Sequence, residues 1–194
     1  MNRIIIKDES KKVLVGNRLM LFVIILIASI VSGALSPVGI GFLLAPLLSV
    51  GLFIIVKDIL AGKKIDANRF LEVFKDLNHA VKVIGVSFLT GIFIIVGCLI
   101  FIIPGIYFFL VYSQAIFIMA EKPSLGIWEA MEESKKMMTG KKMDLLVFHL
   151  SFILHFLLCG ITFGLYGIYF LPYYQTCIVN YYVHLKNEDN TVIN

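Results

Sequence analysis

The chain has 194 residues, of which 59% are hydrophobic and 15% charged, and its mean hydropathy is +0.93. Ordinary soluble domains carry about 25% charged residues, and so few charges cannot cover the surface of a soluble domain of this size. A disordered chain would be polar and charged, so both classes are excluded. The net charge of +4 is spread over links and tails rather than gathered in a stripe between aromatic residues, which argues against nucleic-acid binding.

Six apolar segments are long enough to cross a bilayer as helices. A helix needs about 20 apolar residues to cross a hydrocarbon core of roughly 30 Å, and these segments lack the alternation of a barrel strand. The sequence therefore predicts an all-α, polytopic transmembrane helix bundle. In chain order the predicted spans cover residues 19–35, 38–56, 81–103, 105–120, 145–163 and 165–183.

The links between these segments alternate in character. Residues 36–39, 104–105 and 164–167 are short and uncharged, whereas residues 57–80 and 121–144 are long and charged. All lysines and arginines lie in the long links, in the tails or directly beside them. The positive-inside rule makes that side the cytoplasm. We therefore expect a bacterial cytoplasmic-membrane protein with both termini inside and three hairpins pointing out.

The first segment also permits another interpretation. Basic residues precede it and it contains the small residues Ser32, Gly33 and Ala34, which is the pattern of a cleaved signal peptide. An internal repeat argues instead that this segment belongs to the mature fold.

Two sequence echoes indicate this repeat. The string ESKKVLVGNRLMLFV from Glu9 returns as ESKKMMTGKKMDLLV from Glu133, and GIYFFLVYSQ from Gly105 returns as GIYFLPYYQ from Gly167. A weaker third copy is GIGFLLAP from Gly39. We predict one domain over residues 1–194 that repeats a cytoplasmic amphipathic stretch and a hairpin three times. The approximate repeats are 1–60, 61–122 and 123–194.

The two charged links are predicted to contain amphipathic helices that lie in the membrane interface. In the first, Phe70 and Phe74 share an apolar face and Asp66 caps the helix start. In the second, Trp128 lies on the apolar face, acidic residues come early and lysines late, and Gly140 ends the helix. Such helices form a structural belt or a docking surface for a partner.

Catalytic motifs are missing from the sequence. It contains no G-x-S-x-G, no Walker loop and no H-E-x-x-H, so we expect no enzyme, no cofactor and no metal site. His149 and His155 are six positions apart and do not share a helix face. Each packs between helices or takes a proton or ligand role. Cys98, Cys159 and Cys177 lack C-x-x-C spacing and are expected to be free thiols, with a Cys98–Cys159 disulfide as the alternative.

Several polar residues lie within the predicted spans. Gln114, Gln175 and Asn180 carry amides, and all eight tyrosines fall in the fourth and sixth segments. Because an amide in hydrocarbon needs a partner, these side chains should face the bundle interior. They either hold helices together or line a ligand cavity. The candidate ligand-binding residues are Gln114, Gln175, Tyr112, Tyr173, His149, His155 and Asn180.

Longer strings carry a family resemblance. The strings IIPGIYFFLVYSQAIFIMAEKPSLGIWEAMEESKKMMTGKK and LSFILHFLLCGITFGLYGIYFLPYYQTCIVNYY resemble an uncharacterised bacterial family of small integral membrane proteins, a domain of unknown function. More distantly, they are similar to the membrane domain of some glycerophosphodiester phosphodiesterases. The resemblance covers residues 85–186 well and implies six helices. It implies no established activity, and lipid-headgroup hydrolysis does not transfer because the soluble phosphodiesterase domain is missing.

These observations lead to two expectations for function. The first is a non-enzymatic membrane protein that binds lipid, a membrane-active peptide or a protein partner. The alternative is a transporter or permease component with a site between the helices, favoured by Pro46 and Pro172 within spans and by the Gln114/Gln175 pair. An intramembrane enzyme built around His149 or His155 ranks behind both. No predicted span contains a buried charged residue, which weakens ion-coupled transport.

Overall fold

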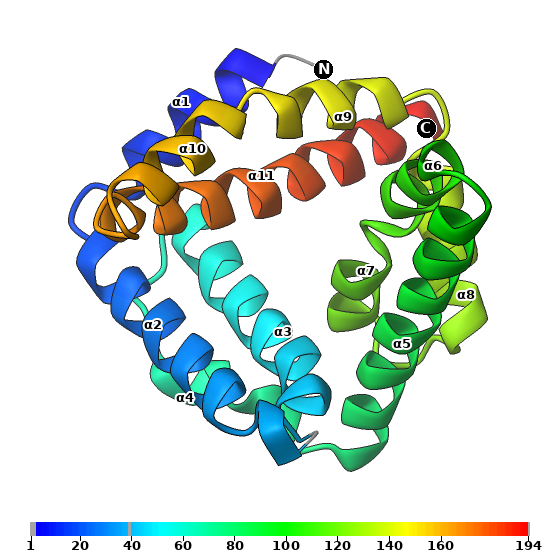
Figure 1. Cartoon of the computed structure of the whole chain (residues 1–194), viewed down its shortest axis with the longest axis horizontal. Helices are drawn as coiled ribbons and strands as arrows, with labels where there is room; N and C mark the ends of the chain where they lie inside the picture. Colours follow the sequence, from blue (N-terminus) through cyan, green and yellow to red (C-terminus); the bar gives the residue numbers. More distant parts are fainter. Residues whose placement is uncertain (1–2, 39, 194) are drawn as a thin grey trace.

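Every regular element in the described part of the chain is a helix. The computed structural model describes residues 3–38 and 40–193, so the Gly39 at which the weakest echo begins lies outside it. The α-helices are α1 (Arg3–Val13), α2 (Arg18–Ala34), α3 (Ile40–Leu60), α4 (Ala67–Phe70), α5 (Leu77–Ile100), α6 (Ile102–Tyr112), α7 (Ala115–Glu121), α8 (Ile127–Met137), α9 (Lys142–Leu150), α10 (Ile153–Ile161) and α11 (Gly167–Ile193), with 3₁₀ turns η1 (Ser36–Val38) and η2 (Glu72–Phe74) (Figure 1).

Four helical stretches are long and apolar enough to cross a membrane. They are Gly41–Leu60 in α3, Leu77–Ile100 in α5, Ile102–Glu121 through α6 and α7, and Lys142–Ile161 through α9 and α10. α1 and α2 meet at a bend of 96° and together give a fifth stretch if they form one broken span. The described residues thus form an all-helical protein with membrane-spanning helices. The sequence predicted six spans. By length and composition, four helical stretches of the structure qualify, or five if the bent pair is one span.

The sixth predicted segment forms a helix that is too polar to qualify by composition. α11 has 27 residues, and Phe170, Cys177 and Tyr181 in it are fully buried. A helix enclosed by other helices contacts little lipid, so it can keep amides and tyrosines that a lipid-facing helix cannot. Its place inside the bundle explains its low hydropathy.

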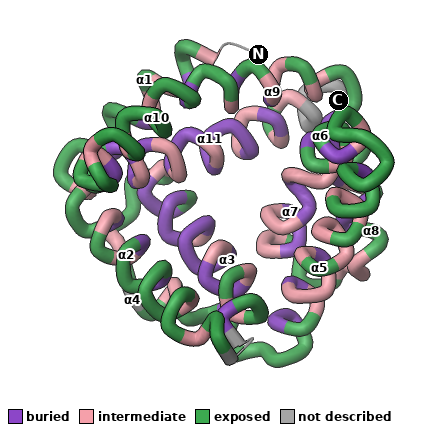
Figure 2. Tube along the Cα trace, in the orientation of Figure 1, coloured by how far each residue is buried: buried purple, intermediate pink, exposed green. Residues whose placement is uncertain are grey.

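Three groups of helices form the sides of a triangle. α2 and α3 form one side, α5 to α7 the second and α9 to α11 the third (Figure 1). Figure 2 shows that burial is concentrated on α3, α7 and α11, which are the inner helices, while the outer helices are largely exposed. The outer surface is apolar over wide stretches, as a lipid-facing surface must be. Examples are Ile30 of α2, Leu99 of α5 and Ile161 of α10, which are 60%, 80% and 72% exposed.

Each inner helix also carries a short helix from the next part of the chain. α4 packs on α3, α8 packs on α7, and α1 packs on α11, which closes the ring between the two ends of the chain. A polar side-chain contact joins the partners at each of these three places. Asp58–Arg69 at 2.8 Å and Lys122–Glu133 at 2.5 Å are ion pairs, and His184 and Glu9 form a hydrogen bond at 2.7 Å.

The prediction of one continuous helix in the first charged link is wrong. Asp66 caps α4 as predicted, since its carboxylate accepts a hydrogen bond from the Asn68 amide at 2.9 Å. A second aspartate, Asp76, caps α5, so the chain breaks between them into α4 and η2. Phe70 therefore packs over Gly51 of α3, while Phe74 is 38% exposed. The two rings do not form one interfacial stripe.

The helix predicted in the second charged link is confirmed as α8. The Glu129 carboxylate accepts a hydrogen bond from the Gly126 amide at 2.7 Å, and two lysines lie in the last turn. Trp128 is 61% exposed, as an interfacial tryptophan would be. Gly16 and Gly140, which the sequence echo paired, both adopt left-handed backbone conformations, with φ of +86° and +74°.

Candidate functional site

A basic, tyrosine-lined cavity lies where α1 and α2 meet α10 and α11. Its volume is about 180 Å³, and Lys11 and Arg18 supply two positive charges. The Arg18 guanidinium carbon lies 3.9 Å from the centre of the Tyr169 ring, and the Lys11 ammonium lies 5.9 Å from that of Tyr173. These are cation–π distances. The remaining lining residues are His155, Tyr166 and Phe170.

Two polar atoms of this cavity lack a hydrogen-bond partner in the part of the chain that the structure describes. Nε of Arg18 and Nδ1 of His155 are both buried, and neither has a hydrogen-bond partner among the described residues. No carboxylate is among the described residues that line the cavity. A buried guanidinium nitrogen without an acceptor is costly. The cavity is therefore electrostatically suited to an anion.

The sequence did not predict a contact between Arg18 and Tyr169, yet the two side chains stack. They meet because α2 and α11, which carry these two residues, contact one another. Lys11 and Arg18 were counted only as orientation-setting charges. One sequence feature could have pointed to Arg18. It is the last positively charged residue before the apolar segment of residues 19–35.

A second cavity brings together three of the predicted ligand residues. Gln114, Gln175 and His149 all line a space of about 210 Å³ between α6, α7, α9 and α11. Ser113, Tyr174 and Tyr181 complete its polar lining. His155 lies in the basic cavity instead, which agrees with the prediction that the two histidines face different ways.

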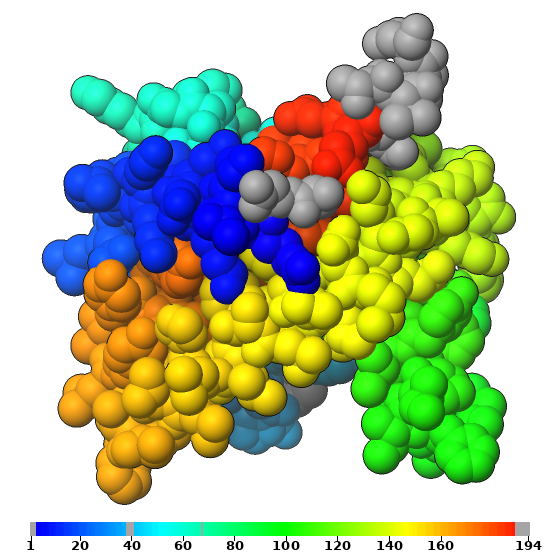
Figure 3. Space-filling model, turned by 90° about the horizontal axis from the view of Figure 1, so that it is seen from above, coloured from blue at the N-terminus to red at the C-terminus, as the bar shows by residue number. Residues whose placement is uncertain are grey.

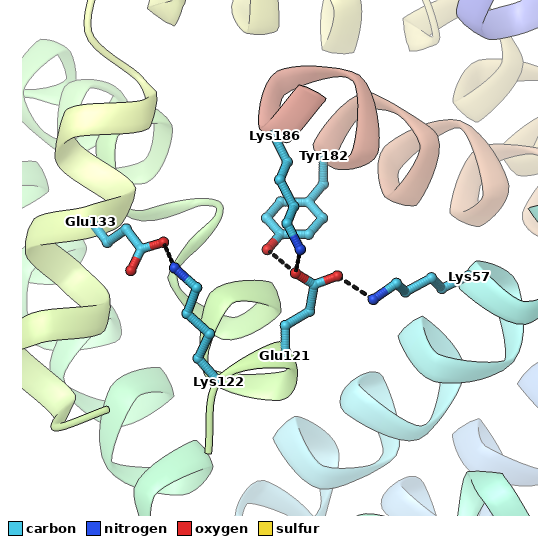
Figure 4. A network of polar contacts seen from close by, with 6 residues as sticks. All are labelled: Lys57, Glu121, Lys122, Glu133, Tyr182 and Lys186. Carbon is cyan, nitrogen blue, oxygen red and sulfur yellow. Dashed lines mark hydrogen bonds and ion pairs between the residues drawn. The ribbon is translucent and has the colours of Figure 1, made fainter. Parts of the chain in front are cut away.

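A polar network joins the three inner helices near their C-terminal ends. The Glu121 carboxylate of α7 pairs with Lys57 of α3 and Lys186 of α11, and it accepts a hydrogen bond from the Tyr182 hydroxyl at 3.0 Å (Figure 4). One turn earlier, the rings of Phe53, Phe117 and Tyr182 lie 4.9 to 5.6 Å apart, one from each inner helix. Both clusters fasten helices together and leave Glu121 fully engaged, so we regard them as structural.

The other predicted site residues lie apart from both cavities. The Asn180 amide donates to the Ile6 carbonyl at 3.2 Å and to Glu9 at 3.1 Å, so it fastens α1 to α11. The His184 hydrogen bond to Glu9 holds the pKa of that carboxyl below its ordinary value. Tyr112 lines a separate space of about 290 Å³ beside α5. The three cysteines are free thiols, so the disulfide alternative is not realised.

Residues 83–189 match the family described as Protein of unknown function (DUF975). The chain belongs to this family. The match covers more than half of the chain, from α5 through most of α11, and so includes the second cavity and the α10–α11 wall of the basic cavity. No curated protein and no solved structure matches the chain. DUF975 membership supports the resemblance to an uncharacterised family, and the more distant similarity to glycerophosphodiester phosphodiesterases stays a prediction.

Proposed function

We propose that this DUF975 protein is a non-enzymatic protein of the bacterial cytoplasmic membrane that binds the phosphate headgroup of anionic lipids in the basic cavity. The observation that carries the proposal is the pairing of Lys11 and Arg18 in a cavity without a lining carboxylate, with Nε of Arg18 buried and unpartnered. Each property favours an anion, and the two together favour one with several acceptor oxygens.

A phosphate group suits the chemistry of this lining. A guanidinium presents a planar array of donors that matches two phosphate oxygens, and an ammonium binds phosphate as a point charge. Tyr166, Tyr169 and Tyr173 add hydroxyl groups. At about 180 Å³ the cavity has room for a headgroup phosphate but not for acyl chains. We therefore place only the headgroup inside it.

The surroundings favour a lipid over a soluble phosphate. Leu19 directly follows Arg18 and is 71% exposed, while Leu154 and Leu158 beside His155 are 64% and 40% exposed. These apolar side chains would contact the acyl chains of a lipid whose phosphate reaches the cations. The basic residues of α1 also attract anionic lipids electrostatically.

The topology that we propose is six helices in three hairpins, with both termini in the cytoplasm. Equivalent contacts recur 64 positions apart in the first two units. Ser49 and Ser113 each donate to the carbonyl three residues earlier, at 2.7 and 2.9 Å. Lys57 and Glu121, also 64 apart, form the central ion pair. Figure 3 supports one orientation, because the green α5–α6 turn and the orange turn after α10 project to the same side, away from the blue α1.

The same spacing corrects the register of the weakest sequence echo. Gly41 lies 64 positions before Gly105, and both glycines lie against the preceding helix so closely that a Cβ atom would collide, with Ser32 and Cys98 respectively. The echo from Gly39 was therefore two residues out of register. In the third unit Tyr182 and Lys186 occupy the places of Phe117 and Glu121.

The lipid proposal is tested by native mass spectrometry of the protein in mild detergent with equal amounts of phosphatidylglycerol and phosphatidylcholine. We expect the wild type to retain phosphatidylglycerol preferentially. The double variant Lys11→Gln/Arg18→Gln should lose this preference, because it removes both cations. Lys12→Gln is the matched control, since Lys12 is an exposed neighbour on the same helix outside the cavity. Equal retention of the two lipids by the wild type, or an unchanged preference in the double variant, would contradict the proposal.

A further inference from the structure

The cavity between α6, α7, α9 and α11 has an uncharged but polar lining. Its volume is about 210 Å³, and it is lined by Gln114, Gln175, His149, Tyr174 and Tyr181 together with Ser113 and apolar residues. No lysine, arginine, aspartate or glutamate is among the described residues that line it. A charged ligand would lose its hydration there without gaining a counter-charge, so the cavity excludes ions.

The orientation of the Gln114 amide follows from its neighbour. The Ser113 hydroxyl donates its hydrogen to the Leu110 carbonyl at 2.9 Å, so it can only accept from Gln114, whose Nε2 lies 2.8 Å away. This leaves Oε1 of Gln114 buried and without a partner among the described residues. Gln114 is only 2% exposed, so water outside the protein does not satisfy that oxygen.

Two further groups add to the unmet hydrogen-bonding capacity. The Tyr181 hydroxyl is buried and has no partner among the described residues, and Tyr181 is fully buried. Nδ1 of His149 lies 3.0 Å from the Leu145 carbonyl, so that nitrogen carries the hydrogen and Nε2 keeps a lone pair. The lining thus offers two acceptors, Gln114 and His149, and a hydroxyl that can donate or accept.

We infer that this cavity binds a small uncharged molecule through its hydroxyl groups. A hydroxyl donates to one acceptor and accepts from another donor, so one alcohol group can donate to Oε1 of Gln114 and accept from the Tyr181 hydroxyl. The volume of about 210 Å³ suits a group of the size of glycerol. Free glycerol and the glycerol hydroxyl of a diacylglycerol share this chemistry.

The position of the cavity gives such a ligand a short path. Gln114 precedes Glu121 by seven residues, which is roughly 10 Å along a helix, and Glu121 lies at the cytoplasmic end of α7 in the proposed topology. Leu145 lies in the first turn of α9. The cavity therefore sits in the cytoplasmic half of the bundle, within reach of a lipid glycerol group or a soluble polyol.

The test measures binding of two probes to the full-length protein in detergent. Glycerol is followed by saturation-transfer NMR, and 1,2-dioctanoylglycerol by native mass spectrometry. We expect at least one probe to bind the wild type, and the one that binds identifies the source of the hydroxyl. Gln114→Met and Tyr181→Phe should each weaken that binding about five- to tenfold, since each removes one hydrogen bond.

The variants are chosen so that loss of folding does not imitate loss of binding. Tyr181→Phe removes a hydroxyl that has no partner within the described protein, so its thermal stability should equal that of the wild type. Tyr107→Phe is the control, because Tyr107 is 46% exposed and lies outside the cavity lining. If neither probe binds the wild type, the cavity holds only water and the inference is wrong. Binding that is unchanged in both Gln114→Met and Tyr181→Phe would equally overturn it.

Discussion

Glu121 is the residue on which the arrangement of the inner helices depends most. Its side chain is 6% exposed and contacts two lysines and a tyrosine from two other helices. Its lysine partners are 45% and 38% exposed, so water partly compensates their charges when the carboxylate is removed. The loss should therefore be smaller than the roughly 3–5 kcal/mol of a fully buried pair, but larger than that of an ordinary surface charge.

We predict that Glu121→Gln lowers the free energy of unfolding by about 2 kcal/mol, measured by denaturant titration in detergent. Glu133→Gln is the control, because Glu133 pairs with Lys122 at the surface, with side chains 32% and 46% exposed. An exposed pair contributes about 0–1 kcal/mol. Equal losses in the two variants would show that Glu121 is not the central tie.

Two turns between helices depend on glycine. Gly16 separates α1 from α2 and Gly140 precedes α9, and both have a positive φ that disfavours other L-residues. A Cβ atom at either position would meet no heavy atom within 4 Å. The cost of substitution at these positions is therefore in the backbone conformation alone.

Gly16→Ala and Gly140→Ala should each destabilise the protein by about 1 kcal/mol, and by similar amounts, because both glycines adopt a left-handed backbone conformation. Gly33→Ala within α2 also meets no neighbouring atom but lacks a positive φ. It should be neutral or stabilising by up to about 1 kcal/mol. Thermal unfolding midpoints of the three variants test this, and a loss at Gly33 as large as at Gly16 would refute it.

At the level of elements, the sequence predicted best where one physical effect dominates. Apolar length located four candidate membrane-spanning stretches to within a few residues, and glycine and aspartate marked turns and caps correctly at Gly140 and Asp66. The sequence did not predict features that depend on the packing of one helix against another. The break between α4 and η2 arises from a second cap at Asp76. The polarity of α11 reflects enclosure by its neighbours, which composition does not reveal.

The candidate sites show the same division. The sequence could indicate that Gln114, Gln175 and His149 face the bundle interior, because amides and imidazoles avoid lipid, and the structure brings them to one cavity. It could not indicate that Lys11 and Arg18 meet tyrosines of α11, because that contact joins the two ends of the chain. It also could not distinguish Asn180 from the cavity-lining residues. The Asn180 amide holds α1 through a hydrogen bond instead.

For the whole molecule, the triangle of three helix groups explains how the two ends of the chain come to share one cavity (Figure 1). Each short helix packs on the inner helix of the unit before it, so α1 can complete the ring only by reaching α11. That closure creates the basic cavity, because Lys11 and Arg18 belong to the first unit and the tyrosines to the third. The proposed headgroup site therefore depends on three hairpins that enter the membrane from one side.

The orientation of the three hairpins is thus the claim to test first. In a variant without native cysteines, single cysteines would replace the exposed turn residues Ser36, Phe101 and Phe163, and for comparison Lys63 and Ser124 in the charged links. A membrane-impermeant maleimide should label the three turns in intact cells and the two links only after the membrane is opened. Labelling of any one turn from the same side as Lys63 would contradict the three-hairpin topology and the headgroup site built on it.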